Sequence, residues 1–225
     1  MISLLHLCDS LFPIGSFAYS DGLESAASRG TVTRTAELAD WLSVCLDESI
    51  GRCDGPAIVA ARSTVERGDW DKLAAIDEEV MALRPSSASR TANRSMGLRL
   101  LKTWQAVYPD TRLEHAIELA RLGRLAPALP IAFSLACFCQ PTPARVEDAL
   151  AAYAYTRLAA GASAAMRLMP LGQMEAHQLL GRLLRRVPRV VEAVMASGEA
   201  PGSFAPALDI AQITQPYVES RLFRS

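Results

Sequence analysis

Apolar residues recur at helical spacing along almost the whole chain, whereas the strict apolar/polar alternation of a half-buried strand is hard to find over strand length. The clearest stretch follows Thr35. Its apolar residues at this spacing are Leu38, Trp41, Leu42, Cys45 and Leu46. One side of such a helix must be buried against other elements. We therefore predict an all-α protein.

Proline, glycine and capping residues divide this pattern into separate helices. We expect Asp54-Gly55-Pro56 to end one helix and open the next, and Thr142-Pro143 to open the longest one. The predicted helices lie near residues 36–51, 56–67 and 70–82, then, after a boundary at Pro85, up to about 107, and near 111–122, 129–139, 142–169, 171–186 and 190–195. Together they form a single-domain bundle of about nine to ten helices.

The longest predicted helix and the C-terminal segment differ most from the other parts of the chain. Residues Leu158 to Ala165 are nearly all small, and small side chains let helix backbones approach closely, so we expect a central helix there. After Gly198 the chain has three prolines and no sustained amphipathic period. We therefore predict a helical domain over residues 1–198 and a flexible, partner-docking tail over residues 199–225. A frayed end without a role explains that composition equally well.

Composition and charge exclude several classes of protein. The 225 residues are 50% hydrophobic and carry a formal net charge of −1, so charge alone would not hold nucleic acid or an anionic membrane. No apolar run is long enough to cross a bilayer, and the first residues lack the pattern of a signal peptide. The five cysteines form no disulfide-like framework, which fits a reducing compartment. We expect a cytoplasmic protein.

Catalytic motifs are missing from the sequence. It contains no phosphate-binding loop, no dinucleotide-binding glycine motif, no HExxH, no GxSxG and no CxxC. Three histidines, His6, His115 and His177, leave few candidates for general acid/base chemistry. We assign no catalytic residue and predict that the chain is not an enzyme.

Two pairs of potential metal ligands have the same spacing. His6 and Cys8 are two positions apart, as are Cys137 and Cys139, and side chains so spaced on a helix point in different directions. Core packing is the better interpretation of both pairs. Because imidazole and sulfur both suit late transition metals, His6 and Cys8 remain weak candidates for a transient metal contact.

The segment Phe12 to Ala26 is the most informative part of the N-terminal half. Pro13 and Gly15 bend the chain ahead of a helix, which is a sufficient structural explanation. The segment also resembles the opening of the urease accessory protein family UreF. The matching residues are Pro13, Ile14, Gly15, Phe17, Tyr19, Ser20, Gly22, Leu23 and Glu24.

Further matches to the same family follow in the family's order along nearly the whole chain. They are Arg90 with Met96-Gly97, the apolar helix start Leu129 to Phe133, the segment Ala164 to Gln173, and the closing Ser220 to Ser225. The sequence departs from the family pattern after Gln173 and again over Thr214 to Glu219. Members of the family usually have a helix in this tail. The departures bear on whether this chain forms that helix and on the details of its partner contacts.

The resemblance implies a dimerising, all-α protein that binds a UreD/UreH-type scaffold and the GTPase UreG, through which nickel reaches the urease apoprotein. It implies no intrinsic cofactor, because nickel would be handled by the complex and GTP by the partner GTPase, whose hydrolysis this chain would gate. We assign scaffold docking to Tyr217 and to the tail residues Arg221, Leu222, Phe223, Arg224 and Ser225.

A second group is expected near the dimer or GTPase surface. It consists of Tyr19 and Glu24 with Arg167, Leu168, Pro170, Leu171, Gly172 and Gln173. A kink between packed helices at Pro170 and Gly172 is the competing explanation of that region.

Two alternatives from other classes remain at this point. A DNA-binding regulator would use the arginines Arg182, Arg185, Arg186 and Arg189, which also suit a solvated helix face. A helical enzyme unrelated to urease would need a convergent polar pocket.

Overall fold

The computed structural model describes residues 1–140 and 142–224, and within them all regular structure is helical, as predicted. The helices are α1 (Ile2–Leu7), α2 (Leu23–Ser28), α3 (Thr35–Val44), α4 (Gly55–Glu66), α5 (Trp70–Ala82), α6 (Ser87–Val107), α7 (Thr111–Arg121), α8 (Leu129–Phe138), α9 (Val146–Leu168), α10 (Gln173–Leu184), α11 (Val187–Ser197) and α12 (Pro206–Thr214). Shorter or irregular helical segments are η1 (Ser16–Ala18), η2 (Cys45–Asp54) and η3 (Gln215–Tyr217). Helices α3 to α11 account for the predicted bundle, and in the described part of the chain no helix is both long and apolar enough to cross a membrane.

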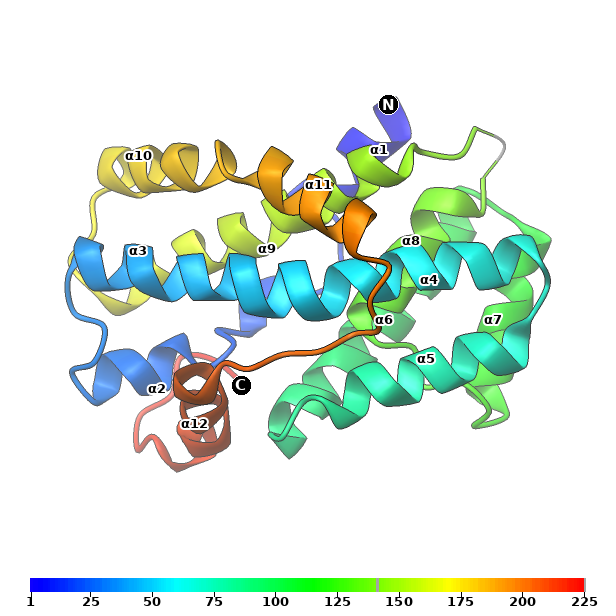
Figure 1. Ribbon diagram of the computed structural model, residues 1–225. Coiled ribbons are helices and arrows are strands. Elements are labelled where there is room, and N and C mark those ends of the chain that lie inside the picture. Colours follow the sequence, from blue (N-terminus) through cyan, green and yellow to red (C-terminus); the bar gives the residue numbers. More distant parts are fainter. Residues whose placement is uncertain (141, 225) are drawn as a thin grey trace.

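A long rod formed by α3, η2 and α4 runs through the middle of the molecule (Figure 1). Helices α10 and α11 lie along one side of this rod, α2 and α12 lie below its α3 end, and α5 to α8 gather around its α4 end (Figure 1). The C-terminal segment thus returns to the N-terminal helix α2, which is far from it in sequence.

The prediction at Asp54-Gly55-Pro56 is half right: α4 begins at Gly55 with Pro56 in its first turn, but the chain stays helical through this boundary instead of being interrupted. Residues Cys45–Asp54 form a π-helix, in which the N–H of Gly55 donates to the carbonyl of Ile50, five residues earlier. A proline inside a helix leaves the carbonyl four residues earlier without its donor. Here that carbonyl belongs to Arg52, and it accepts from the N–H of Gly202 at 2.8 Å. A distant segment is therefore hydrogen-bonded to the rod at the turn that contains Pro56.

The start of the longest helix also differs from the prediction. Helix α9 begins at Val146, with Arg145 as its N-terminal cap, so Thr142-Pro143 does not open it. Helix α9 contacts α2, α3, α8, α10 and α11, as expected of a central helix. The helix buried along its whole length, however, is α8, which packs against α4, α6 and α9. Apolar residues on every face of α8 explain this burial.

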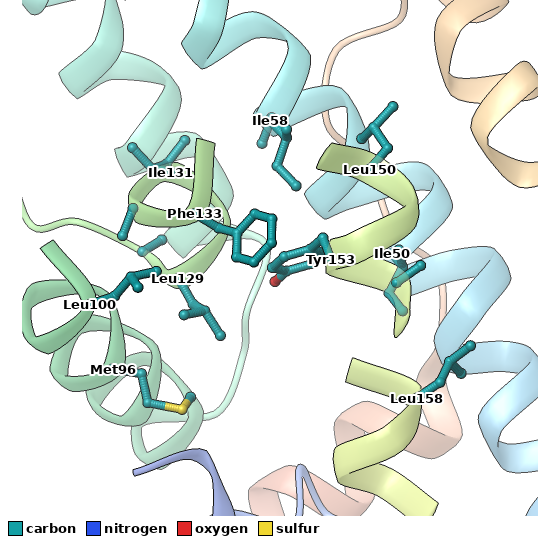
Figure 2. Packing of buried hydrophobic residues seen from close by; sticks show 14 of the residues in the cluster. Ile50, Ile58, Met96, Leu100, Leu129, Ile131, Phe133, Leu150, Tyr153 and Leu158 are labelled. Carbon is teal, nitrogen blue, oxygen red and sulfur yellow. The ribbon is translucent and has the colours of Figure 1, made fainter. Parts of the chain in front are cut away.

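Helices α8 and α9 meet inside the core. Figure 2 shows Phe133 of α8 pointing at Tyr153 of α9, with Ile58 and Leu150 beside them. The two rings meet edge to face with centroids 5.2 Å apart. The Tyr153 hydroxyl donates to Asp54 at 2.7 Å, and Asp54 also pairs with Arg84. Burial raises the pKa of Tyr153 well above its usual value, so this hydroxyl stays protonated.

We predict that Gly97→Ala destabilises the fold by about 3 kcal/mol, because a methyl group there would lie 2.0 Å from the carbonyl oxygen of Pro127. The matched control is Gly181→Ala in helix α10, where nothing lies within 4 Å, and which should stabilise the protein by up to about 1 kcal/mol. Urea denaturation of both variants measures the difference. Equal effects of the two substitutions would contradict the close packing at Gly97.

Asp77 provides a second prediction. Its carboxylate accepts the N–H groups of Ala126 and Ala128, but burial dominates and raises its pKa from 3.8 to about 6. Between pH 4 and 6 the folded chain would hold a proton that the unfolded chain has lost. The free energy of unfolding should therefore fall by about 3 kcal/mol from this group as pH rises through that window.

The measurement is urea denaturation from pH 4 to 7 for the wild type and for Asp77→Asn. The substitution should reduce the pH dependence even though it lowers stability overall. If the free energy of unfolding changes with pH in Asp77→Asn as it does in the wild type, Asp77 does not have the raised pKa.

Candidate interaction site

Glu24 is a buried carboxylate in the first turn of α2, with an exposed fraction of 3%. It accepts hydrogen bonds from the side-chain amide of Gln215 at 2.5 Å and from the backbone N–H groups of Leu222 at 2.5 Å and Phe223 at 3.2 Å. All three donors come from the C-terminal segment. A buried carboxylate is stable only when hydrogen bonds replace its water, so Glu24 fastens this segment to α2.

Gln215 also connects the C-terminal segment to α2. It is completely buried, and its side-chain oxygen accepts the N–H of Ser25 at 3.0 Å while its nitrogen donates to Glu24. Gly22 allows the close approach of α12, because a methyl group there would lie 2.9 Å from the backbone nitrogen of Gln212. Its φ of +88° also favours glycine.

Phe223 anchors the end of the described chain. Its exposed fraction is 3%, and the guanidinium of Arg167 lies over its ring at 4.3 Å from the centroid. Arg167 also donates to the carbonyl of Phe17 at 3.0 Å, and the N–H of Arg224 donates to the carbonyl of Ala18 at 2.8 Å. Segment η1, the end of α9 and the C-terminus are thereby joined. We call Glu24, Arg167, Gln215, Leu222 and Phe223 the C-terminal clasp.

The structure brings the two predicted groups of site residues together. One surface hollow is lined by Tyr19, Arg167, Leu222 and Arg224, and a neighbouring hollow by Glu24, Arg167, Tyr217 and Leu222. Arg221 is exposed in the same segment, and Ser225 lies outside the described residues. Gln173 is exposed in the first turn of α10 and lines neither hollow.

The C-terminal segment differs from the expected partner-docking tail in two ways. It contains a helix, α12, that the sequence pattern did not indicate, and Phe223 faces inward although we expected an exposed apolar anchor. Tyr217 and Leu222 do face solvent, with exposed fractions of 80% and 60%, and Phe17, which lines one hollow together with Leu222, is 76% exposed. Tyr217 lines the neighbouring hollow with Leu222. We call these three exposed apolar residues, Phe17, Tyr217 and Leu222, the clasp surface.

Gln215 and Ser25 are the residues of this site that the sequence analysis missed. A glutamine in a proline-containing polar segment is ordinarily exposed, and nothing in its neighbours indicates burial. Glu24 in the family-like segment was the signal, because a carboxylate among Leu23, Ser25 and Ala26 needs partners if that turn is buried.

The weak metal candidates have other contacts. Nδ1 of His6 lies 3.0 Å from the hydroxyl of Tyr108, and its ring packs against Phe12 and Trp104. Burial raises the pKa of the Cys8 thiol to about 11, which disfavours the thiolate that binds metals. Among the residues that the structure describes, no group of three or more His, Cys, Asp or Glu side chains is arranged to hold a metal ion.

Comparison with known proteins identifies relatives along the whole chain. The family model UreF matches residues 32–184. The chain is 32% identical to the urease accessory protein UreF of Polaromonas sp. over all of its own length and 94% of that protein. It is 34% identical to the protein of the same name from Azoarcus sp., again over its whole length and 95% of the relative.

We predict that Glu24→Gln loosens the C-terminal segment. The new amide would direct N–H groups at backbone donors, leave one of them unsatisfied, and cost about 2 kcal/mol. Trypsin should then cleave after Arg221 faster than in the wild type, as followed by mass spectrometry of the intact chain. The control is Glu219→Gln, an exposed carboxylate of the same segment, which should leave cleavage unchanged. Equal cleavage rates in wild type and Glu24→Gln would contradict the clasp.

Proposed function

The chain belongs to the UreF family and is a urease accessory protein rather than an enzyme, and on this premise we propose that it joins a UreD/UreH-type scaffold to the GTPase UreG. In this proposal nickel is the cargo of the complex, GTP is bound by the partner, and the urease apoprotein receives the metal. The chain acts in the cytoplasm as a homodimer and gates GTP hydrolysis through its contacts. Family membership replaces the alternatives of a DNA-binding regulator and an unrelated helical enzyme.

The clasp surface is the observation that carries the proposal. Phe17, Tyr217 and Leu222 leave large apolar areas in water, beside the guanidinium groups of Arg167 and Arg224. Apolar anchors next to arginine are typical of protein interfaces. Because Glu24, Gln215 and Phe223 are buried behind them, the exposed residues are held in place before a partner arrives. We therefore assign scaffold docking to this surface.

The predicted site residues include both buried and exposed side chains, and we propose different roles for the two kinds. Glu24 and Phe223 are buried within the chain, so in this proposal they position the surface. Tyr217, Leu222, Arg221 and Arg224 are exposed and would contact the scaffold. Tyr19 and Arg167 lie at the edge of the same surface, and Gln173 on α10 is left as the contact for the GTPase or a second copy.

We expect that deleting Ser220 to Ser225 abolishes co-purification with a UreD-type scaffold protein while the chain remains helical by circular dichroism. Because the deletion also removes the buried Phe223, the sharper variant is Tyr217→Ala with Leu222→Ala. It should weaken scaffold binding at least about tenfold with little change in the free energy of unfolding, since both side chains are exposed. Isothermal titration calorimetry measures the affinity.

The control for the double variant is Leu122→Ala, which removes an exposed leucine from the end of α7. It should bind the scaffold as the wild type does. If Tyr217→Ala with Leu222→Ala also binds normally, scaffold docking does not use the clasp surface.

A further inference from the structure

A second surface feature lies on the opposite side of the α3–η2–α4 rod from α12. A groove lies between η2 and α11, and its lining combines arginines with two acidic residues and several apolar side chains. The arginines are Arg52, Arg185, Arg186 and Arg189, the acidic residues are Asp47 and Glu199, and the apolar lining includes Val190 and Val194. We call this feature the basic groove. None of its arginines belongs to the C-terminal clasp.

The groove has a fixed shape because two glycines of η2 and α4 let α11 pack closely. A methyl group on Gly51 would lie 3.1 Å from Cγ1 of Val190, and one on Gly55 would lie 3.0 Å from Cγ2 of Val194. These contacts bury Val194 and half-bury Val190. The groove is thus built from a tightly packed helix pair rather than from mobile loops.

The positive charge of the groove is only partly neutralised within the chain. Arg186 pairs with Asp47 at 2.6 Å, and Arg52 approaches Glu48 at 3.4 Å. Over residues 1–140 and 142–224, Arg185 and Arg189 have no ion-pair partner. The first turn of α11 also carries no acidic residue, so the positive end of its helix dipole adds to the arginines.

We propose that the basic groove binds an acidic, amphipathic segment of a partner protein. Carboxylates of that segment would pair with Arg185 and Arg189, and an apolar side chain would lie against the half-buried Val190. Nucleic acid fits less well, because Asp47 and Glu199 also line the groove and would repel phosphates. This site goes beyond the proposed function and uses none of the clasp surface.

The test uses a fluorescein-labelled helical peptide in which pairs of Glu alternate with pairs of Leu, titrated with the full chain by fluorescence anisotropy. We expect binding that weakens as salt is raised, and at least about tenfold weaker binding for Arg185→Glu with Arg189→Glu. The control, Arg121→Glu with Arg124→Glu, changes the net charge equally at the end of α7 and should bind as the wild type does. Arg185→Ala with Arg189→Ala should show a smaller loss.

Several outcomes would overturn the proposal. They are no binding of the peptide by the wild type, equal binding by the Arg185/Arg189 and Arg121/Arg124 variants, and tighter competition by a DNA duplex than by the unlabelled peptide. A change from dimer to monomer in Arg185→Glu with Arg189→Glu, measured by light scattering, would instead make the groove a contact between copies of this chain. Circular dichroism of each variant separates these results from unfolding. Scaffold binding by the same variants reports on the clasp independently.

Discussion

The buried carboxylate of Glu24 is the constraint on which the functional surface depends. Removing a carboxylate from water costs several kcal/mol unless hydrogen bonds replace its solvation. In this chain the replacements come from Gln215 and from two backbone N–H groups of the last few described residues. The C-terminal segment is therefore required by the N-terminal helix α2, and folding of one end determines the position of the other. Gln215 and the backbone of Leu222 and Phe223 are fixed in this way, so the exposed Tyr217 between them is held in one position.

The π-helix η2 plays a comparable part in the middle of the chain. It connects α3 to α4 without interruption, and the carbonyl of its residue Arg52 accepts the N–H of Gly202. That hydrogen bond holds the connection between α11 and α12 against the rod (Figure 1). The same rod thus supports α11, which forms the basic groove, and directs the chain toward the clasp. Both surfaces depend on one irregular helix.

Membership in the UreF family assigns the chain to urease maturation. The structure separates residues that fix the C-terminal segment from residues that stay exposed. The buried polar residues Glu24 and Gln215 form hydrogen bonds within the chain, whereas the side chains of Tyr217 and Leu222 are exposed to solvent. Preorganisation of this kind lowers the entropic cost of association, because the contact residues are already ordered. In the proposed role, these exposed residues would supply the contacts with partner proteins.

The sequence by itself determined the all-α class, the positions of most helices and the family-like segments, because helical period and turn residues are local properties. Through the family resemblance it also named Glu24, Arg167 and the C-terminal residues as candidate partner contacts. Only the tertiary structure decided that these residues meet, that Phe223 faces inward, and that Gln215 is buried. Glu24 and Gln215 are 191 positions apart, and a hydrogen bond over that separation leaves no periodic trace in the sequence. A side chain near a chain end is buried only where a distant surface offers hydrogen-bond partners to the polar groups around it. That surface exists only after folding.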